Sequence, residues 1–385
     1  MRILIAPNAF KNSLNAELAA FSIRKGFSRS ALHCDCECFP IGEGGDGTGS
    51  LIVKKLKGNL VTLTVPGPLG KSIKAPLGFI DGGKTAVIEM ADASGLKLLS
   101  KNELDPLKAS SYGTGIQIKH ALDEGVKKII IGMGGTATVD GGTGILKALG
   151  VRFLNKAGHD LYLPAELKNL EKVELSGIDQ RILKCEIIVL CDVSNMLLGK
   201  FGSAAVFGPQ KGASPTEVQM LDSALARLSN VTYKQTGKNM AAVPAGGTAG
   251  GAAAGLNVFL AANLLNGIEY FLRLTSFDKA LDKTDLVVTG EGYIDEQTLK
   301  GKGPFGVAIQ AKKRGLAVIA MAGGVPIKKN EVLNKYFDVL LAIGNEPSDL
   351  QTALDRTSDN LIRVSCEVGN LLARFPLQGP LSQST

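Results

Sequence analysis

The stretch Lys128-Ile-Ile-Ile-Gly-Met-Gly-Gly135 is a short run of β-branched residues that ends abruptly in glycines. A near-continuous apolar run of this length is typical of a strand that is covered on both faces of its sheet. Six further segments repeat the pattern, each ending in a cluster that contains Gly, Asp, Asn or Pro: Arg2–Asn8, Thr85–Asp92, Glu186–Asp192, Asp285–Glu291, Ala317–Gly323 and Asp338–Gly344. These strands predict an α/β protein with mostly parallel sheets.

Helical patterns lie between many of these strands. Ala16–Phe27 and Gly115–Leu122 place apolar residues at steps of three and four, which is the spacing of one helix face. In open α/β sheets, ligands bind beyond the carboxyl ends of the strands. The residues that close the strands are therefore the first candidates for a site: Asn8, Asp92, Gly134, Gly135, Asp192 and Glu291.

The length of 385 residues is enough for two domains. Turn signals gather around residues 60–80, above all in Pro66-Gly-Pro-Leu-Gly70. We expect the first strand and the last three to share one sheet, and the middle of the chain to form a second domain. The expected domains are residues 1–65 plus 280–385 and residues 66–279, with a ligand cleft between them at the carboxyl ends of the strands.

The composition is that of a globular protein, because 45% hydrophobic and 21% charged residues exclude a disordered chain. The 47 glycines indicate tight loops in which backbone can approach a ligand closely. The net charge of +7 is spread along the chain, so we expect no nucleic-acid partner. The uncharged stretch Asn239–Ile268 contains Pro244 and many glycines, and it predicts a Gly-rich loop leading into a buried helix rather than a membrane span.

The six cysteines form no C-x-x-C pair, which excludes zinc ribbons and thioredoxin-like motifs. Cys34-Asp-Cys-Glu-Cys38 predicts a strand whose thiols face the core, with metal binding as the minority alternative. The apolar run before Pro7 is too short for a signal peptide. We therefore expect a cytoplasmic protein with reduced thiols.

Two glycine motifs resemble a dinucleotide fingerprint, and both are weak signals. Gly42–Gly47 fits G-x-G-x-x-G, and Gly132–Ala137 fits its alanine variant, whereas no segment fits the Walker A motif. Glu43 and Asp46 would repel a pyrophosphate unless a metal ion lay between them. The first motif therefore suits a metal–phosphate loop better than a bare dinucleotide loop.

Acidic residues and lysines meet at several strand ends. Glu291 and Asp295 end one strand and Lys302 follows among glycines, a combination that suits magnesium-dependent phosphoryl transfer. Asp192 ends another strand and could bind a metal, accept a hydroxyl proton or cap the next helix. Asp140 is similar, with helix capping again as the alternative.

Two further elements could face an anion. Lys211 lies between glycines in Phe207–Ala213, where it could contact a phosphate or be an exposed turn residue, and the spacing favours the turn. The Gly-rich run Ala245–Gly255 could present backbone N–H groups to an anion at a helix start. Close helix packing through small residues explains this run equally well.

The chain resembles the bacterial glycerate kinase family that includes the glyoxylate- and glucarate-pathway enzymes. The resemblance runs nearly end to end and rests on these ordered motifs: Ala6–Ser13, Gly44–Thr48, Ile88–Ala91, Gly113–Gly115, Gly134–Gly142, Cys191–Asn195, Phe207–Ala213, Thr289–Asp295 and Gly301–Lys302. It implies ATP-dependent phosphorylation of D-glycerate, with 2-phosphoglycerate as the favoured product, a Mg²⁺ requirement and a two-domain α/β fold whose second domain is flavodoxin-like. The family pattern usually has Asp at Asn8, Ala-Asp at Gly42-Glu43, Asn at Val139 and Arg at Tyr293.

We therefore expect a metal-dependent kinase of a small hydroxy acid, in which positioning and charge neutralisation carry the reaction. The expected site comprises Asp192 and Lys11 as catalytic residues, Ser13, Asn195 and Lys302 for the substrate, Lys211, Gly246, Gly247, Gly250 and Gly251 for ATP, and Glu291, Asp295 and Asp46 for Mg²⁺. Two alternatives stay open: a nucleotide-dependent oxidoreductase of a hydroxy acid, and a non-catalytic metabolite-binding protein of the same fold.

Overall fold

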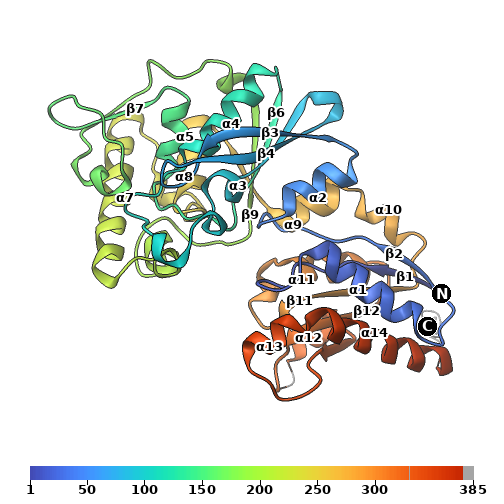
Figure 1. Cartoon of the computed structure of the whole chain (residues 1–385). Coiled ribbons are helices and arrows are strands. Elements are labelled where there is room, and N and C mark those ends of the chain that lie inside the picture. The colour runs from blue at the N-terminus through green and yellow to red at the C-terminus, as the bar shows by residue number, and fades with distance from the viewer. Residues whose placement is uncertain (329, 376–385) are drawn as a thin grey trace, which may run out of the picture. The chain divides into compact units, whose positions relative to one another are not determined.

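The computed structural model describes residues 1–328 and 330–375 (Figure 1). The chain divides into two compact units: unit 1 comprises Met1–Glu43 and Ile268–Thr385, and unit 2 comprises Gly44–Gly267. The domain borders expected after residues 65 and 279 lie further along the chain than these two divisions. Whether the units fold as separate domains stays a prediction.

Unit 1 is built on a five-stranded sheet in the order β13-β12-β11-β1-β2, and every neighbouring pair is parallel. Its strands are β1 (Arg2–Ile5), β2 (Asp35–Cys38), β11 (Leu286–Tyr293), β12 (Ala317–Gly324) and β13 (Val339–Ala342). The first strand and the last three thus share one sheet, as expected. Because β1 has β2 on one side and β11 on the other, the strand order reverses between β1 and β11, where α/β sheets bind ligands.

Most helices of unit 1 bury apolar residues, whereas the short helix Leu350–Asp355 buries none. The helices are α1 (Ala16–Ser28), α9 (Gly267–Leu274), α10 (Phe277–Leu281), α11 (Gly303–Lys312), α12 (Glu331–Tyr336), α13 (Leu350–Asp355) and α14 (Thr357–Arg374), with a 3₁₀ turn at Thr298–Lys300. Helix α1 begins where the Asn15 side chain accepts the N–H of Leu18 at 2.9 Å, an N-cap that satisfies a free donor. Helices α1 and α14 lie side by side (Figure 1).

The cysteine-rich segment forms the edge strand β2, as predicted. Cys34, Cys36 and Cys38 are half-buried and pack against the core of unit 1. Burial raises the pKa of the Cys36 thiol to about 12, with the neighbouring Cys34 adding to the rise, so this thiol stays protonated near neutral pH. All six cysteines are free.

Unit 2 contains a six-stranded sheet in the order β10-β9-β6-β5-β4-β3. The first four strands are mutually parallel, whereas β4 runs antiparallel to both of its neighbours, β5 and β3. The strands are β3 (Asn59–Pro66), β4 (Ser72–Ile80), β5 (Thr85–Glu89), β6 (Lys128–Gly132), β9 (Glu186–Cys191) and β10 (Asn263–Asn266). The turn signals at Pro66–Gly70 thus mark a hairpin between β3 and β4, where the N–H of Gly67 donates to the carbonyl of Lys71 at 2.7 Å.

The helices of unit 2 are α2 (Thr48–Lys55), α3 (Met90–Ser94), α4 (Tyr112–Asp123), α5 (Thr143–Ala148), α6 (Ser203–Phe207), α7 (Pro215–Thr236) and α8 (Ala252–Leu260). Short 3₁₀ turns lie at Asp81–Gly83, Leu96–Leu98, Lys101–Glu103, Pro164–Asn169, Ile182–Lys184, Pro209–Lys211 and Met240–Ala242. The glycine-rich stretch before α8 leads into a largely buried helix, as predicted. Among the helices that the structure describes, none combines the length and apolar composition needed to cross a membrane.

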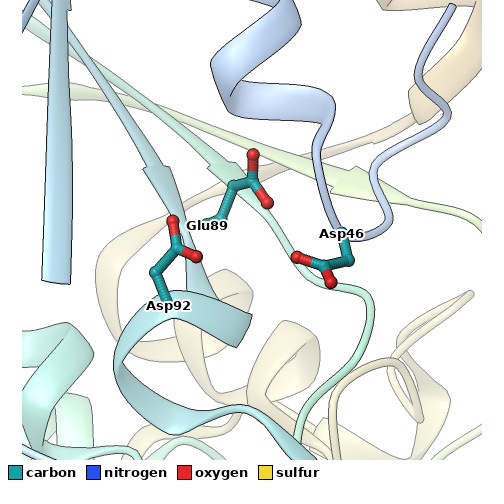
Figure 2. A group of neighbouring side chains, drawn as sticks. All are labelled: Asp46, Glu89 and Asp92. Carbon is teal, nitrogen blue, oxygen red and sulfur yellow. The ribbon is translucent and has the colours of Figure 1, made fainter. Parts of the chain in front are cut away.

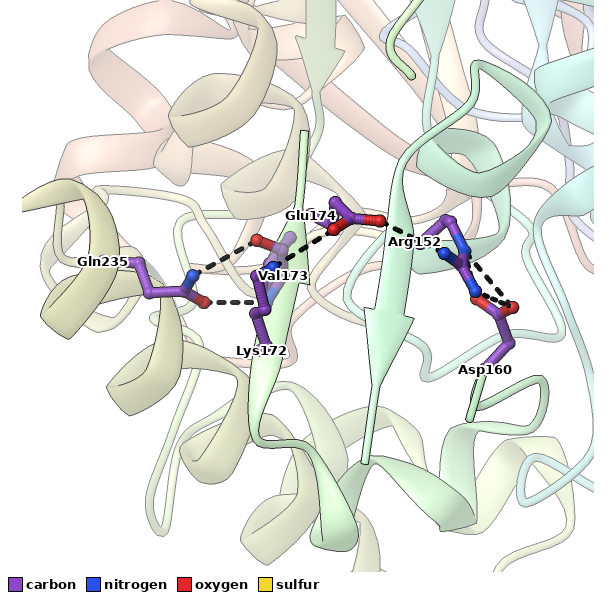
Figure 3. A network of polar contacts seen from close by, with 6 residues as sticks. All are labelled: Arg152, Asp160, Lys172, Val173, Glu174 and Gln235. Atoms are coloured by element: carbon purple, nitrogen blue, oxygen red, sulfur yellow. Dashed lines mark hydrogen bonds and ion pairs between the residues drawn. The ribbon is translucent and has the colours of Figure 1, made fainter. Parts of the chain in front are cut away.

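A small second sheet in unit 2 pairs β7 (Arg152–Leu154) with β8 (Lys172–Glu174). Figure 3 shows how side chains complete it: the Gln235 amide donates to the Val173 carbonyl at 3.2 Å and accepts the Val173 N–H at 2.7 Å. Arg152 pairs with Asp160 at 2.9 Å and with Glu174 at 3.2 Å. Because the two larger sheets are mostly parallel and their strands alternate with helices along the chain, the predicted α/β class with mostly parallel sheets is confirmed.

Candidate functional site

The carboxyl ends of β5, β6 and β9 lie at one edge of the unit 2 sheet. Glu89 pairs in register with Gly132, and Gly132 pairs with Leu190. Asp192 follows Leu190 by two residues, so its backbone leaves the sheet at this edge. The acid that sequence reasoning selected is thus placed where parallel sheets bind ligands.

The loop before α2 reaches the same edge. The N–H of Gly134 donates to the carbonyl of Gly44 at 2.9 Å. A Cβ on Gly44 would lie 2.7 Å from the Leu190 carbonyl oxygen, which is closer than side chains approach, so this contact requires glycine. The contact brings Asp46, two residues further on, to the ends of β6 and β9.

Asp46, Glu89 and Asp92 form an acidic group, which we call the carboxylate trio. Their ligand atoms lie within 4.8 Å of one another, and Figure 2 shows the three side chains turned toward a common space. The Lys97 ammonium contacts Asp46 at 2.6 Å and Asp92 at 2.7 Å. A cation therefore already bridges two of the carboxylates, and oxygen ligands of this kind suit Mg²⁺.

Glu89 is the buried member of the trio. Its two carboxylate oxygens accept the N–H groups of Gly47 at 2.6 Å and Ser50 at 3.0 Å, where α2 begins. Burial, with a smaller contribution from the Asp92 charge, raises the pKa of Glu89 to about 7. Bound cations favour the charged form of a carboxylate, so a metal at this position would counteract the rise.

In unit 1, a second charged group lies where the strand order reverses between β1 and β11. Glu291 is buried on β11 and accepts the Thr298 hydroxyl at 3.0 Å. Glu43 is also buried and accepts the first N–H of α11 at 2.6 Å. Burial and the Glu43 charge raise the pKa of Glu291 to about 7, while the charges of Lys302 and Lys11 oppose the rise.

The expected Mg²⁺ ligands belong to both units. Asp46 belongs to the carboxylate trio in unit 2. Asp295 in unit 1 accepts the N–H of Gln297 at 2.8 Å and so closes a local turn. Over residues 1–328 and 330–375, neither Glu291 nor Asp295 belongs to a group of three metal-ligating side chains.

Two of the three residues expected to bind substrate donate a hydrogen bond within the protein. The Ser13 hydroxyl donates to the carbonyl of Leu354 at 2.6 Å. The Asn195 amide donates to the carbonyl of Phe201 at 2.8 Å. Lys302 is half-buried at the N-cap of α11, and its charge acts on Glu291. Their roles toward a substrate stay predictions.

Lys211 is not the exposed turn residue that the spacing favoured. Only 3% of its surface is exposed, and its ammonium donates to the Thr136 hydroxyl at 3.1 Å and the Thr138 carbonyl at 2.7 Å. Burial lowers the pKa of Lys211 to about 7, and the Asp140 charge only partly opposes this. The Lys211 side chain thus lies in the interior of unit 2.

The lowered pKa of Lys211 predicts a pH-dependent stability. The folded protein holds this proton up to about pH 7 and the unfolded chain up to about pH 10.5, so between these values the unfolded chain binds more protons. The free energy of unfolding should therefore rise with pH across this window, by at most about 1.4 kcal/mol per pH unit.

Lys211→Met removes the titrating group and provides the reference for this prediction. The melting temperature of the wild type should rise relative to that of Lys211→Met from about pH 7 to about pH 9. Melting curves of both proteins in matched buffers measure this difference. A difference that does not change with pH would contradict the lowered pKa.

The Gly-rich run before α8 packs against its own unit. A Cβ on Gly250, where φ is +69°, would lie 2.0 Å from the Thr138 carbonyl oxygen. A Cβ on Gly247 would lie 2.3 Å from the carbonyl oxygen of Met196. These approaches support the close-packing alternative, and a contact of Gly246, Gly247, Gly250 and Gly251 with ATP stays a prediction.

Asp192 and Asp140 differ in what they do for neighbouring helices. Asp192 is half-buried, and the next helix begins only at Ser203, so the helix-capping alternative for Asp192 is wrong. Asp140 is buried and accepts the N–H and hydroxyl of Ser111 at 2.9 and 2.6 Å. It also accepts two N–H groups at the start of α5, which supports capping for Asp140.

The residues that depart from the family pattern differ in burial. Asn8 is buried, and its side-chain oxygen accepts the N–H of Ala9 at 2.8 Å. Val139 lies in the core of unit 2, whereas Tyr293 is exposed at the end of β11. Neither Asn8 nor Tyr293 supplies a charge at its position.

Glu89 and Lys97 were missed by sequence reasoning. Glu89 lies inside a run that was assigned to a strand as far as Asp92, but β5 ends at Glu89. The acidic residue at the end of this apolar run was the signal from which Glu89 could have been selected. Lys97 belongs to no motif, and its place between Asp46 and Asp92 depends on the fold of three separate segments.

Comparison with known proteins identifies the family. The model of the glycerate kinase family matches residues 3–373. A glycerate kinase of Halalkalibacterium halodurans is 45% identical, over 94% of this chain and 95% of that protein. The glycerate 2-kinase of Escherichia coli strain K12 is 39% identical, over 97% of this chain and 98% of that protein.

A solved structure agrees with the sequence comparisons. The crystal structure described as "putative glycerate kinase 2 from Salmonella typhimurium LT2" superposes with a TM-score of 0.81 at 39% identity. The match covers 97% of this chain and 99% of that one. Sequence and fold agree over nearly the full length, and this chain belongs to the glycerate kinase family.

Proposed function

We propose that this chain transfers the γ-phosphoryl group of ATP to the C2 hydroxyl of D-glycerate, giving 2-phosphoglycerate and ADP. Family membership supports a glycerate kinase, and the name of the E. coli relative supports the C2 position. The observation that carries the proposal is the shared edge of β5, β6 and β9, where the carboxylate trio and Asp192 follow parallel strands. Acids at such an edge suit phosphoryl transfer, which depends on positioning and charge neutralisation.

The carboxylate trio fits a divalent cation. Three carboxylates share one small region, and an ammonium group already lies between two of them. We propose that Asp46, Glu89 and Asp92 hold Mg²⁺, which when bound neutralises phosphate charge. Glu89 keeps its orientation through the N–H groups of Gly47 and Ser50 at the start of α2, so its carboxylate is pre-positioned.

Asp192 is our candidate for the group that orients the attacking hydroxyl. It would accept a hydrogen bond from the C2 hydroxyl of glycerate and take its proton as the oxygen–phosphorus bond forms. In kinases an Asp of ordinary basicity is sufficient, because the proton leaves late. Asp192 directly follows Cys191, the last residue of β9, so its position is set by the end of that strand.

In unit 1, Lys11 and Lys302 are candidates for neutralising the glycerate carboxylate or the phosphates. The charges of both lysines favour the ionised form of the buried Glu291, which supports a place for them near the end of β11. The Ser13 hydroxyl donates to the Leu354 carbonyl and the Asn195 amide to the Phe201 carbonyl. Each side chain keeps further hydrogen-bonding capacity, with which it would contact substrate. We propose a cytoplasmic location, which agrees with six free cysteines.

An assay of ADP formation from ATP across small hydroxy acids, with Mg²⁺ present, tests the proposal. D-glycerate should give the highest kcat/KM. A change in NADH or NADPH absorbance with hydroxy acids would instead favour the oxidoreductase. Ligand-induced rises in melting temperature without ATP turnover would favour a binding protein.

A further inference from the structure

The loop between β6 and α5, residues 133–142, follows the site edge of the unit 2 sheet and is rich in glycine. Gly135, Gly141 and Gly142 have φ values of +73°, +62° and +77°, a conformation that glycine adopts readily. Glycine also loses the most conformational freedom on folding. The position of this loop therefore depends on the groups that hold it.

The first half of the loop is bonded to the segment that carries Lys97. The Gly135 carbonyl accepts the N–H of Leu96 at 2.8 Å, and the N–H of Ala137 donates to the Ser94 carbonyl at 2.9 Å. Leu96 directly precedes Lys97, whose ammonium bridges two carboxylates of the trio. The loop is thus hydrogen-bonded to the residue next to Lys97, and Lys97 contacts Asp46 and Asp92.

Lys211 holds the loop from the other side. Its ammonium donates to the Thr136 hydroxyl and to the Thr138 carbonyl, on either side of Ala137. Both acceptors are uncharged, and the side chain is almost fully buried. A lysine that serves a phosphate would point its ammonium to solvent or ligand, whereas this one points to the Thr136 hydroxyl and the Thr138 carbonyl of the loop.

The second half of the loop is fixed by Asp140. Its carboxylate accepts the N–H and hydroxyl of Ser111 and the N–H groups of Gly142 at 3.0 Å and Gly144 at 3.1 Å. The charge of Asp140 also favours the protonated form of Lys211. Lys211 therefore acts on the part of the loop between this anchor and the site edge.

We propose that Lys211 is a positioning residue, which fixes loop 133–142 through Thr136 and Thr138 and thereby sets the geometry of the carboxylate trio without touching phosphate. The inference deepens the proposed function, since it rests on this edge serving Mg²⁺ and ATP. It replaces the direct contact with ATP that the sequence alone predicted for Lys211.

Three variants test the proposal. Lys211→Met removes the donor, Thr136→Val removes one acceptor at nearly constant shape, and Thr136→Ser keeps the hydroxyl as the matched control. Mn²⁺ affinity, measured by electron paramagnetic resonance without ATP, reports on the trio independently of turnover. The KM for ATP, the KM for D-glycerate, kcat and the melting temperature complete the measurements.

Lys211→Met should weaken Mn²⁺ binding and lower kcat by about 10-fold, the scale typical of a group that orients metal ligands. Thr136→Val should cause a smaller loss of the same kind, Thr136→Ser should behave as wild type, and the Lys211→Met/Thr136→Val double variant should be no worse than Lys211→Met. If Lys211→Met fails to fold, the Mn²⁺ affinities of Thr136→Val and Thr136→Ser test the proposal by themselves.

Two results would overturn the proposal. Wild-type Mn²⁺ affinity in folded Lys211→Met and Thr136→Val would reduce Lys211 to a purely structural group. A raised KM for ATP in Lys211→Met alone, with additive losses in the double variant, would restore direct phosphate binding. Absence of ADP formation by the wild type contradicts the proposed function instead, and the Mn²⁺ measurement still decides the role of Lys211.

Discussion

Asp192→Asn is expected to lower kcat for glycerate phosphorylation by about 10²- to 10⁴-fold, the range typical of losing a general base. Asn keeps the shape and the hydrogen-bonding reach of Asp but cannot take the proton of the attacking hydroxyl. Because Asn has nearly the volume of Asp and keeps hydrogen-bonding groups, the substitution should leave the melting temperature near that of the wild type. Steady-state kinetics with circular dichroism melting curves measure both quantities.

Asp179→Asn is a matched control for this experiment. Asp179 lies in the segment that leads into β9 and pairs with Arg181 at 2.7 Å, away from the carboxyl end of that strand. Its loss should leave kcat unchanged. If Asp192→Asn turns over as the wild type does while remaining folded, the proton-accepting role passes from Asp192 to another acid.

Asp92→Asn is expected to raise the Mg²⁺ concentration needed for half-maximal activity by at least about 100-fold, since losing a ligand costs more than the 10- to 100-fold typical of its outer partners. The substitution removes one of the two carboxylates that contact Lys97 and leaves the volume of the side chain unchanged. Excess Mg²⁺ or Mn²⁺ should restore part of the activity. A magnesium titration of activity measures the effect, and a chelator should abolish turnover in both proteins.

Glu103→Gln is the control for the loss of charge. Glu103 forms an exposed ion pair with Lys71 in the same unit, and ion pairs of this kind contribute little to stability. Its magnesium titration should superimpose on that of the wild type. An unchanged titration for Asp92→Asn, or full turnover in excess chelator, would refute the metal assignment to the carboxylate trio.

Most of the strands that lead to the candidate site could be predicted from local patterns. Seven apolar runs, from Arg2–Asn8 to Asp338–Gly344, became strands because continuous β-branched segments suit a sheet covered on both faces. Asp192 could be selected because it follows a recognisable strand, and Asp46 because it lies within the Gly42–Gly47 motif. The hairpin of β3 and β4 was harder to predict, because its turn resembles a domain border.

The contacts within the candidate site could not be predicted in this way. The environment of Lys211 depends on residues 136 and 138, more than seventy positions away, so its turn motif contained no sign of its burial. The trio depends on the register of β5 and β6 and on a loop that only glycine allows to approach. The hydrogen bond from the Gln297 N–H to the Asp295 carboxylate, in the turn after β11, could not be predicted from the motif either.

The most direct test of the proposed function is phosphorus NMR of the product formed by the wild-type protein from ATP, Mg²⁺ and D-glycerate. The assignment predicts ADP and 2-phosphoglycerate in equal amounts, with formation of both stopped by a chelator. Formation of 3-phosphoglycerate would contradict the C2 assignment. ATP that stays intact in the presence of D-glycerate and Mg²⁺, with folded protein, would contradict the kinase itself.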